Sequence, residues 1–542
     1  MNHVITKSVG KSHSRKNLIS LFFCIFIFAS TFTVYLKTLL PTVGTGDAAK
    51  YQFISTVMGI PHNPGYPLYI LISKLFSFLP VGSMAYRINL MSAFFASLTG
   101  CVIFLLVKKI SENNFAGLSA ALVFCFSNIL WSQAVIAEVH TLNIFFISLI
   151  LFFLISYYQN KNEKYLYFAV IVFAFGIGHH FLIFTVFPSI ILAVLFTNPA
   201  FFKKIKKVLL LLLPFLIPVG LYMFLYIRAG RHPIYNEGEI NSLSSFFWYI
   251  TDGVFKGKFF SFTFYQLFDR FLMYINILLN QFAIPVVFLS IAGAILMLIE
   301  KTRIFLILFP VILLNMFIII NYGIYDIDIY IIPSVLIFSI FWGYLLYFFL
   351  EKTLSLPFLN KGSLKSPAYS AAAAIIILFT ALSFYNIKNV YNTNDSSKEY
   401  DHYLRAKNIL EKVEDDAVII PEDYFVAMTL NYYIWVESDK KNVLVPFSYI
   451  PNIYFADSKH LKDKLGIEIP SLRMNIEDIA QYKRENNLFM KDIEKIIKTR
   501  PVYILNTDSI IEKTFILEKV GNNKDEPFSY INPELFKIVA VK

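Results

Sequence analysis

The chain has 542 residues, of which 57% are hydrophobic and only 16% charged, with a mean hydropathy of +0.59. Soluble domains carry roughly 25% charged residues, so this composition excludes a water-soluble globule for most of the chain. The net charge is +11, and its basic excess lies in residues 1–388, which hold 27 Lys and Arg against 12 Asp and Glu. Basic residues between apolar runs set membrane topology, whereas nucleic-acid binding needs an exposed basic face, so we expect membrane lipids and no nucleic acid as partners.

A membrane-spanning helix needs about 20 mostly apolar residues. We predict eleven such spans and therefore a polytopic α-helical membrane protein. In chain order they are 18–40, 86–107, 115–131, 139–157, 165–179, 180–197, 206–227, 274–299, 303–321, 329–350 and 369–387. The first has a longer apolar core than a signal peptide and no A-x-A cleavage site, so we expect it to stay in the membrane.

The distribution of basic residues predicts the orientation. With the N-terminus in the cytoplasm, clusters such as Lys108-Lys109 and 203–207 fall on the cytoplasmic side, as the positive-inside rule requires. An odd number of spans then places the C-terminal part outside the cytoplasm. The high usage of Phe, Ile, Lys and Asn is typical of A/T-rich bacterial genomes, so the expected location is a bacterial inner (plasma) membrane.

Two long segments lie between predicted spans on the outer side, 41–85 and 228–273. The first contains three prolines within 61–67, which end any helix, and then an apolar run, 68–79, that is too short to span and suits an interfacial or re-entrant helix. The second mixes aromatic residues with scattered charge, a pattern typical of a helix at the headgroup level.

Residues 389–542 differ from the membrane domain, 1–388, because helical and strand patterns alternate along them. The patterns predict helices over 397–413 and 476–494, and strands over 417–421, 442–446, 501–505 and 536–541. We therefore expect a small extracytoplasmic α/β domain, large enough for its own core.

Ionisable residues at membrane depth are costly and are functional candidates. Here they gather on the predicted outer face. Asp47 is either a general base or the N-cap of the helix that follows it. Glu138, with His140, either binds an acceptor or a metal, or begins an interfacial helix. Asp328, with Asp326, is an acceptor contact or interface polarity.

Cationic candidates lie on the same face. The pair His179-His180 either binds a phosphate or is a satisfied buried pair. Arg228, near the end of a predicted span, would suit a phosphate, or its side chain extends to lipid headgroups. The motifs GxSxG, HExxH, GxGxxG and Walker A do not occur in the sequence, which leaves hydrolase and nucleotide-driven chemistry without support.

Several sequence blocks are similar to those of one membrane family. They are Gly46-Asp47, the run 62–69 (HNPGYPLY), the run 86–93 (YRINLMSA), and further matches at 131–143, 178–180, 226–229 and 328–333. These blocks resemble the protein O-mannosyltransferase-like family, long catalogued as a domain of unknown function, within the GT-C superfamily of lipid-dependent glycosyltransferases.

The resemblance implies a GT-C fold whose active site opens to the outer leaflet, a polyprenyl-phosphate sugar as donor, and a protein, lipid or glycan acceptor. Transfer from a glycosyl phosphate needs a carboxylate to take the acceptor proton, and our hypothesis is that Asp47 is this base and that Glu138 orients the acceptor. We expect His179, His180 and Arg228 to contact the donor phosphate. Residues expected to bind the acceptor or to shape the outer loops are His62, Asn63, Tyr66, Arg87 and Asp328.

The chain departs from the family pattern at three places. Asn63 stands where the family usually has a second proline, and His140 stands where tyrosine is expected. In the first outer segment Asp47 is followed by Ala48, Ala49 and Lys50, so no acidic pair supports a divalent metal, and no cofactor is assigned.

We therefore expect a membrane glycosyltransferase that transfers a hexose such as mannose to an acceptor outside the cytoplasm. The alternative is a transporter or flippase of a lipid-linked glycan, which needs charged residues along both halves of its path. A non-catalytic scaffold would leave the outer polar cluster without a purpose.

Overall fold

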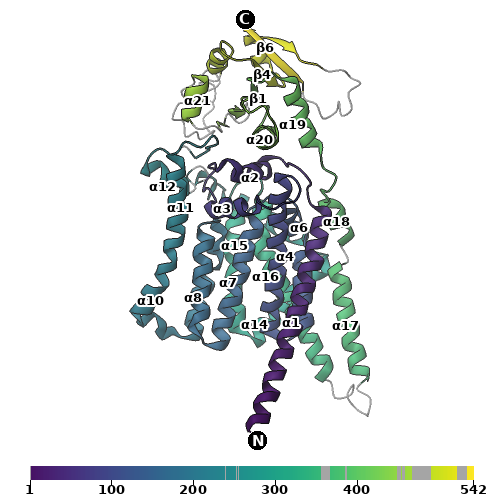
Figure 1. Cartoon of the computed structure of the whole chain (residues 1–542). Coiled ribbons are helices and arrows are strands. Elements are labelled where there is room, and N and C mark those ends of the chain that lie inside the picture. Colours follow the sequence, from purple (N-terminus) through teal and green to yellow (C-terminus); the bar gives the residue numbers. More distant parts are fainter. Residues whose placement is uncertain are drawn as a thin grey trace.

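The computed structural model describes residues 2–542 except 239, 252, 254–255, 356–365, 385–386, 449–452, 455–457, 467–489 and 522–533. A bundle of long helices carries the C-terminal domain at one end, and the N-terminus lies at the other (Figure 1). We call the end next to the C-terminal domain the domain-side end.

Within the described ranges, seven helices are long and apolar enough to cross a membrane. They are Asn17–Thr38 of α1 (Asn2–Thr38), α4 (Met84–Ser111), α7 (His140–Asn160), Ile205–Ala229 (α10, Ile205–Leu212, to α11, Leu216–Ala229), α15 (Thr302–Asn321), Ile327–Ser355 (η5, Ile327–Ile331, and α16, Ile332–Ser355) and Pro367–Phe384 of α17 (Ser366–Phe384). The chain is thus an integral membrane protein, as predicted.

Two bent helix pairs raise the number of spans to nine if each is one span: α5 (Asn114–Cys125) with α6 (Asn128–Ala134), bent by 67°, and α13 (Phe264–Leu279) with α14 (Ile284–Glu300), bent by 105°. The predicted span 274–299 is therefore wrong as one continuous helix. Pro285 stands in the first turn of α14, where its missing N–H and fixed φ favour the start of a new helix.

The predicted number of eleven spans exceeds this range because two of them are short in the structure. Residues 165–179 fall on α8 (Glu163–Ile177), and 180–197 fall on η1 (Phe181–Val186) and α9 (Phe187–Thr197). A helix of 15 residues is about 22 Å long, which is less than the roughly 30 Å of a hydrocarbon core. The pair is two separate helices joined at Gly178, not one bent helix.

Burial separates a central helix from peripheral ones. The apolar window of η5–α16 is 89% buried, against 17% for α1 and 11% for Ile205–Ala229, and Figure 1 shows α10 and α11 at one edge of the bundle. Most exposed side chains on α10 and α11 are apolar, for example Leu209, Leu216 and Val219. A surface of this kind requires a lipid environment.

Short elements cover the domain-side end of the bundle. They are α2 (Gly46–Val57), α3 (Pro67–Phe76) and α12 (Leu243–Ile250). The predicted short helix 68–79 is confirmed as α3, and the proline-rich run before it forms a turn in which Tyr66 has a positive φ of 45°.

The C-terminal domain follows α18 (Ile387–Asn394), so the predicted boundary at residue 388 lies inside this helix and stays a prediction. The strand order of its sheet is β1-β4-β6-β5. The strands are β1 (Val418–Ile420), β4 (Val502–Leu505), β5 (Phe515–Lys519) and β6 (Leu535–Val541), with β1 parallel to β4 and the other pairs antiparallel. The helices are α19 (Asp401–Lys412), α20 (Tyr424–Tyr432), α21 (Ser458–Leu465) and α23 (Ser509–Thr514), and β2 (Phe447–Ser448) pairs with β3 (Ile453–Tyr454).

Alternate residues of each strand point to opposite faces of this sheet. Ile419 and Tyr503 pack into a core shared with α19, α20 and α2, whereas Val418 and Val502 pack with α21 and α23. The predicted helix 397–413 and three of the four predicted strands are confirmed. Within 442–446 only Leu444 forms a single bridge, to Val418, so the predicted strand there is wrong. The predicted helix 476–494 lies mostly outside the described residues.

The close packing of α14 against α16 at Gly293 can be tested by substitution. A Cβ atom at Gly293 of α14 would lie 2.1 Å from the carbonyl oxygen of Phe341 in α16, so Gly293→Leu should push these helices apart and cost about 1–3 kcal/mol. At Gly220 of α11 a Cβ would meet nothing within 4 Å. Thermal unfolding of the purified protein in detergent should show a lower midpoint for Gly293→Leu and an unchanged one for Gly220→Leu; equal midpoints would contradict this packing.

Candidate active site

Asp47 lies in the first turn of α2. Thr45 is the N-cap residue of this helix, in an extended conformation, so the alternative role of Asp47 as the N-cap is wrong. A carboxylate in a first helical turn is stabilised by the helix dipole. The side chain is 37% exposed, so a ligand can reach it.

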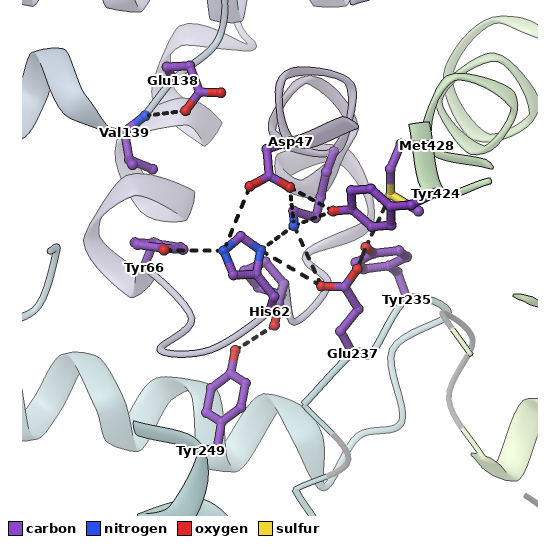
Figure 2. Close-up of polar contacts among 12 residues, drawn as sticks. Asp47, His62, Tyr66, Glu138, Val139, Tyr235, Glu237, Tyr249, Tyr424 and Met428 are labelled. Carbon is purple, nitrogen blue, oxygen red and sulfur yellow. Dashed lines mark hydrogen bonds and ion pairs between the residues drawn. The ribbon is translucent and has the colours of Figure 1, made fainter. Parts of the chain in front are cut away.

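Lys50 follows one turn later, and its side chain is fully buried. Its ammonium Nζ donates to Asp47 Oδ1 at 2.8 Å and to the Tyr424 hydroxyl at 2.6 Å, and it makes a third, short contact with Nδ1 of His62 (Figure 2). These three contacts match the three hydrogens of an ammonium group. A buried charge without such partners would cost several kcal/mol.

Glu237 is the second carboxylate near Lys50, and it lies beside Tyr235 (Figure 2). Its Oε2 is 3.6 Å from Lys50 Nζ, and its Oε1 accepts a hydrogen bond from Tyr235. The backbone N–H of Glu237 donates to the carbonyl of Ile60 at 3.0 Å, which attaches this segment to the turn before α3. Two carboxylates thus share one buried cation.

His62 connects the cluster around Lys50 to Tyr66. Because Lys50 donates to Nδ1, the imidazole hydrogen lies on Nε2, which is 3.2 Å from the Tyr66 hydroxyl and 3.8 Å from Asp47 Oδ2. Burial and the charge of Lys50 lower the pKa of His62 to about 4, although Asp47 acts in the opposite direction. His62 is therefore a neutral donor at physiological pH.

The pKa values of the carboxyl groups diverge. Burial by itself would raise the pKa of Asp47, but the charge of Lys50, the neighbouring His62 and hydrogen bonds from Lys50 and Tyr424 hold this pKa well below its usual range. Burial raises the pKa of Glu138, and the negative charge of Asp47 raises it further. Burial also raises the pKa of Glu237, against the effect of Lys50. At neutral pH Asp47 is thus the ionised and accessible carboxylate.

The predicted histidine pair lies beside Tyr66. The ring of His180 stacks on that of Tyr66 at 5.9 Å and lies 5.1 Å from that of His140. Its Nδ1 accepts the backbone N–H of Leu182 at 3.2 Å, which leaves Nε2 as a donor. His179 Nε2 lies 2.8 Å from the carbonyl oxygen of Val139, and its buried Nδ1 has no hydrogen-bond partner among the residues that the structure describes.

The structure thus gathers Asp47, His62, Tyr66 and His180 at one place. Glu138 contributes charge to the same region, but its carboxylate accepts from the N–H of Val139, at 3.3 Å.

Other predicted site residues make contacts elsewhere. Arg228 donates to the carbonyls of Met58 and Val57 at the far end of α2 from Asp47. Asn63 donates to the Tyr249 carbonyl, and Arg87 donates to three carbonyls within 77–82. These are contacts that shape loops. Asp328 lies exposed in η5.

Lys50, Glu237 and Tyr424 also belong to the candidate site, although the sequence did not indicate them. Spacing of three residues places Lys50 on the same helical face as Asp47, a signal that could have identified it. Tyr424 is separated from Lys50 by 374 residues, and no local pattern indicates such a contact. Among the described residues, no group of three or more His, Cys, Asp or Glu side chains has the geometry of a metal site.

The fold and this polar cluster define a membrane protein with a charged site at the domain-side end. Residues 47–202 match the family described as the protein O-mannosyl-transferase TMEM260 N-terminal domain. The mouse protein O-mannosyl-transferase TMEM260 is 32% identical over 139 residues, which are 26% of this chain and 20% of the mouse protein. The Dictyostelium discoideum protein of the same name is 26% identical over 240 residues, or 41% of this chain and 29% of that protein.

Solved structures extend the likeness to most of the chain. ArnT from Cupriavidus metallidurans, solved with undecaprenyl phosphate bound, has a TM-score of 0.58 at 11% identity and covers 95% of this chain and 98% of its own. AglB from Archaeoglobus fulgidus, an archaeal oligosaccharyltransferase in complex with an inhibitory peptide and a dolichol-phosphate, has a TM-score of 0.50 at 10% identity and covers 89% and 69%.

These findings confirm the predicted resemblance to protein O-mannosyltransferases and the predicted fold class. The protein is a polytopic helical membrane protein that shares its fold with ArnT and has a C-terminal domain built around a sheet. The sequence matches span less than a third of either curated relative.

Because Asp47 and Glu237 share the charge of Lys50, we expect Lys50 to contribute to the stability of the folded protein. Lys50→Met leaves Asp47 and Glu237 without their partner and should destabilise the protein by roughly 3–5 kcal/mol. Adding Glu237→Gln removes one of the stranded carboxylates and should restore part of the loss. Thermal unfolding at neutral pH measures both effects.

The matched control is Lys407→Met, which removes an exposed lysine 4.0 Å from Glu411 and should change stability by less than about 1 kcal/mol. Equal unfolding midpoints for Lys50→Met and Lys407→Met would show that Lys50 does not neutralise the cluster.

Proposed function

We propose that the protein is a membrane glycosyltransferase that transfers a hexose from a polyprenyl-phosphate carrier to an acceptor hydroxyl. Mannose and a protein hydroxyl are the sugar and acceptor that the names of the relatives indicate. The reaction takes place at the domain-side end, which we assign to the extracytoplasmic face on the basis of the basic loops. The amino-acid composition favours a bacterial plasma membrane. A carrier of this chemical type is bound by ArnT and by AglB, according to their structures.

The observation that carries the proposal is the state of Asp47. This carboxylate is ionised, partly exposed and fixed on one side by Lys50 and Tyr424. In the proposed reaction the acceptor oxygen attacks C1 of the sugar while the bond from C1 to the phosphate oxygen breaks. Asp47 takes the hydroxyl proton, and the carrier phosphate leaves with the bonding electrons.

Donors near the base support binding of the phosphate. His180 presents an Nε2–H and His179 lies beside it, so we assign both to the donor phosphate. We assign Glu138 to orientation of the acceptor. The geometry does not favour Arg228 as a phosphate ligand, because its guanidinium group holds the end of α2.

The distribution of buried charge favours this proposal over a transporter. Among the described residues of the membrane domain, the charged or imidazole side chains that are fully buried are Lys50, His140, His179 and His180. All four lie at the domain-side end, whereas a transport path requires polar groups along both halves of the membrane.

The first experiment replaces Asp47 by Asn. With purified full-length protein, polyprenyl-phosphate hexoses and serine- or threonine-containing peptides, release of polyprenyl phosphate should fall by about 10²–10⁴-fold. Asp415→Asn is the matched control, because Asp415 is 86% exposed in the C-terminal domain, and it should keep the wild-type rate. A full rate in Asp47→Asn would remove Asp47 as the base.

A second experiment uses the wild-type protein to distinguish a transferase from a transporter. Release of polyprenyl phosphate with one hexose donor supports the transferase. Movement of a labelled lipid-linked sugar across proteoliposomes without any such release would replace it by the transporter.

A further inference from the structure

The C-terminal domain contacts the candidate site through one helix, α20. The side chain of Asp423 caps the helix by accepting the N–H of Val426 at 2.9 Å, and Tyr424 is the first helical residue. The hydroxyl of Thr429 donates to the carbonyl of Gly44 at 3.0 Å. A Cβ atom at Gly46 would lie 2.8 Å from the ring of Phe425, so only glycine permits this approach of α20 to α2.

Tyr424 enters the polar cluster at the end of this contact (Figure 2). Its hydroxyl oxygen accepts a hydrogen bond from Lys50 and donates its single hydrogen to Asp47 Oδ1 at 2.7 Å. Burial raises the pKa of Tyr424, as do the charges of Asp47 and Glu237, so the phenol keeps that hydrogen at physiological pH.

The two oxygens of Asp47 are therefore in different states. Oδ1 receives hydrogen bonds from both Lys50 and Tyr424, whereas Oδ2 is 3.8 Å from His62 Nε2, beyond hydrogen-bond length. An oxygen that already accepts two hydrogen bonds is the weaker proton acceptor. The less engaged oxygen, Oδ2, is the one able to take a proton from a substrate.

We propose that Tyr424 is a positioning residue of the active site: it holds Oδ1 so that Oδ2 accepts the proton, and the C-terminal domain thereby completes the catalytic centre. This inference rests on the proposed function in taking Asp47 as the base. It goes further because it assigns a role in catalysis to a residue outside the region that matches the mannosyltransferase family.

Loss of the phenol should change the titration of Asp47. Several elements contribute ionisable groups that interact with Asp47. They are Lys50, Tyr51, His62, Glu138, His140, Tyr235, Glu237, Asp326 and Tyr424. Tyr424→Phe removes one hydrogen bond to the ionised form and leaves the others, so the pKa of Asp47 should rise. Because the base acts when ionised, the acidic limb of the pH–rate profile should move to higher pH.

The test compares Tyr424→Phe with Tyr432→Phe in the full-length protein. Tyr432 ends the same helix, donates to Glu437 and accepts the N–H of Ala85 at 3.0 Å, so it docks the same domain without touching Asp47. Tyr424→Phe should lower kcat by about 10- to 100-fold, with little change in the KM for the donor and with the shifted acidic limb. Tyr432→Phe should keep the wild-type pH profile.

A second readout needs no donor or acceptor. Amidation of Asp47 by a carbodiimide and an amine, followed by mass spectrometry, reports the pH at which this carboxyl becomes protonated. The midpoint should be higher in Tyr424→Phe than in the wild type and Tyr432→Phe. An unchanged midpoint, or the same shift in both variants, overturns the inference even if the transfer reaction is confirmed. Absence of sugar transfer in the wild type would refute only the proposed function, because the labelling midpoint still reports whether Tyr424 controls Asp47.

Discussion

A single buried ammonium group organises the domain-side end of the protein. Lys50 is fully enclosed, and its partners come from α2, from the turn before α3, from the segment after α11 and from α20 of the C-terminal domain. An enclosed charge is tolerated only when its partners are in place. The same contacts that neutralise Lys50 therefore fix the positions of Asp47, His62 and Tyr424, so the packing of the two domains and the geometry of the candidate site are inseparable.

Environment gives the carboxylates different properties although their chemistry is the same. Asp47 is partly exposed and kept ionised by a cation and hydrogen bonds, whereas burial and the neighbouring negative charge of Asp47 raise the pKa values of Glu138 and Glu237. Separation of this kind is how active sites obtain groups of distinct function from one residue type. It singles out Asp47 as the carboxylate that is both ionised and within reach of a ligand.

The region of the chain that matches the mannosyltransferase family contains only some of the residues of the candidate site. The region matched by the mannosyltransferase family, 47–202, contains Asp47, Lys50, His62 and the histidine pair. Glu237 and Tyr424 lie outside it. The likeness to ArnT extends over 95% of the chain at 11% identity, so the arrangement of helices persists where few residues are shared. The charge balance around Lys50 depends on both the matched region and the rest of the chain.

The sequence by itself determined the membrane class, the short helix α3 and most of the sheet of the C-terminal domain, because hydropathy and periodicity are local properties. It also indicated Asp47 as a candidate site residue. It did not determine the continuity of helices: the apolar run 274–299 gives no sign of the 105° bend before α14, since hydropathy records burial in lipid and not the direction of the chain. Only the tertiary structure placed Tyr424 beside Asp47 and directed Arg228 to the end of α2. Contacts between residues hundreds of positions apart depend on how whole helices pack, and no local pattern encodes them.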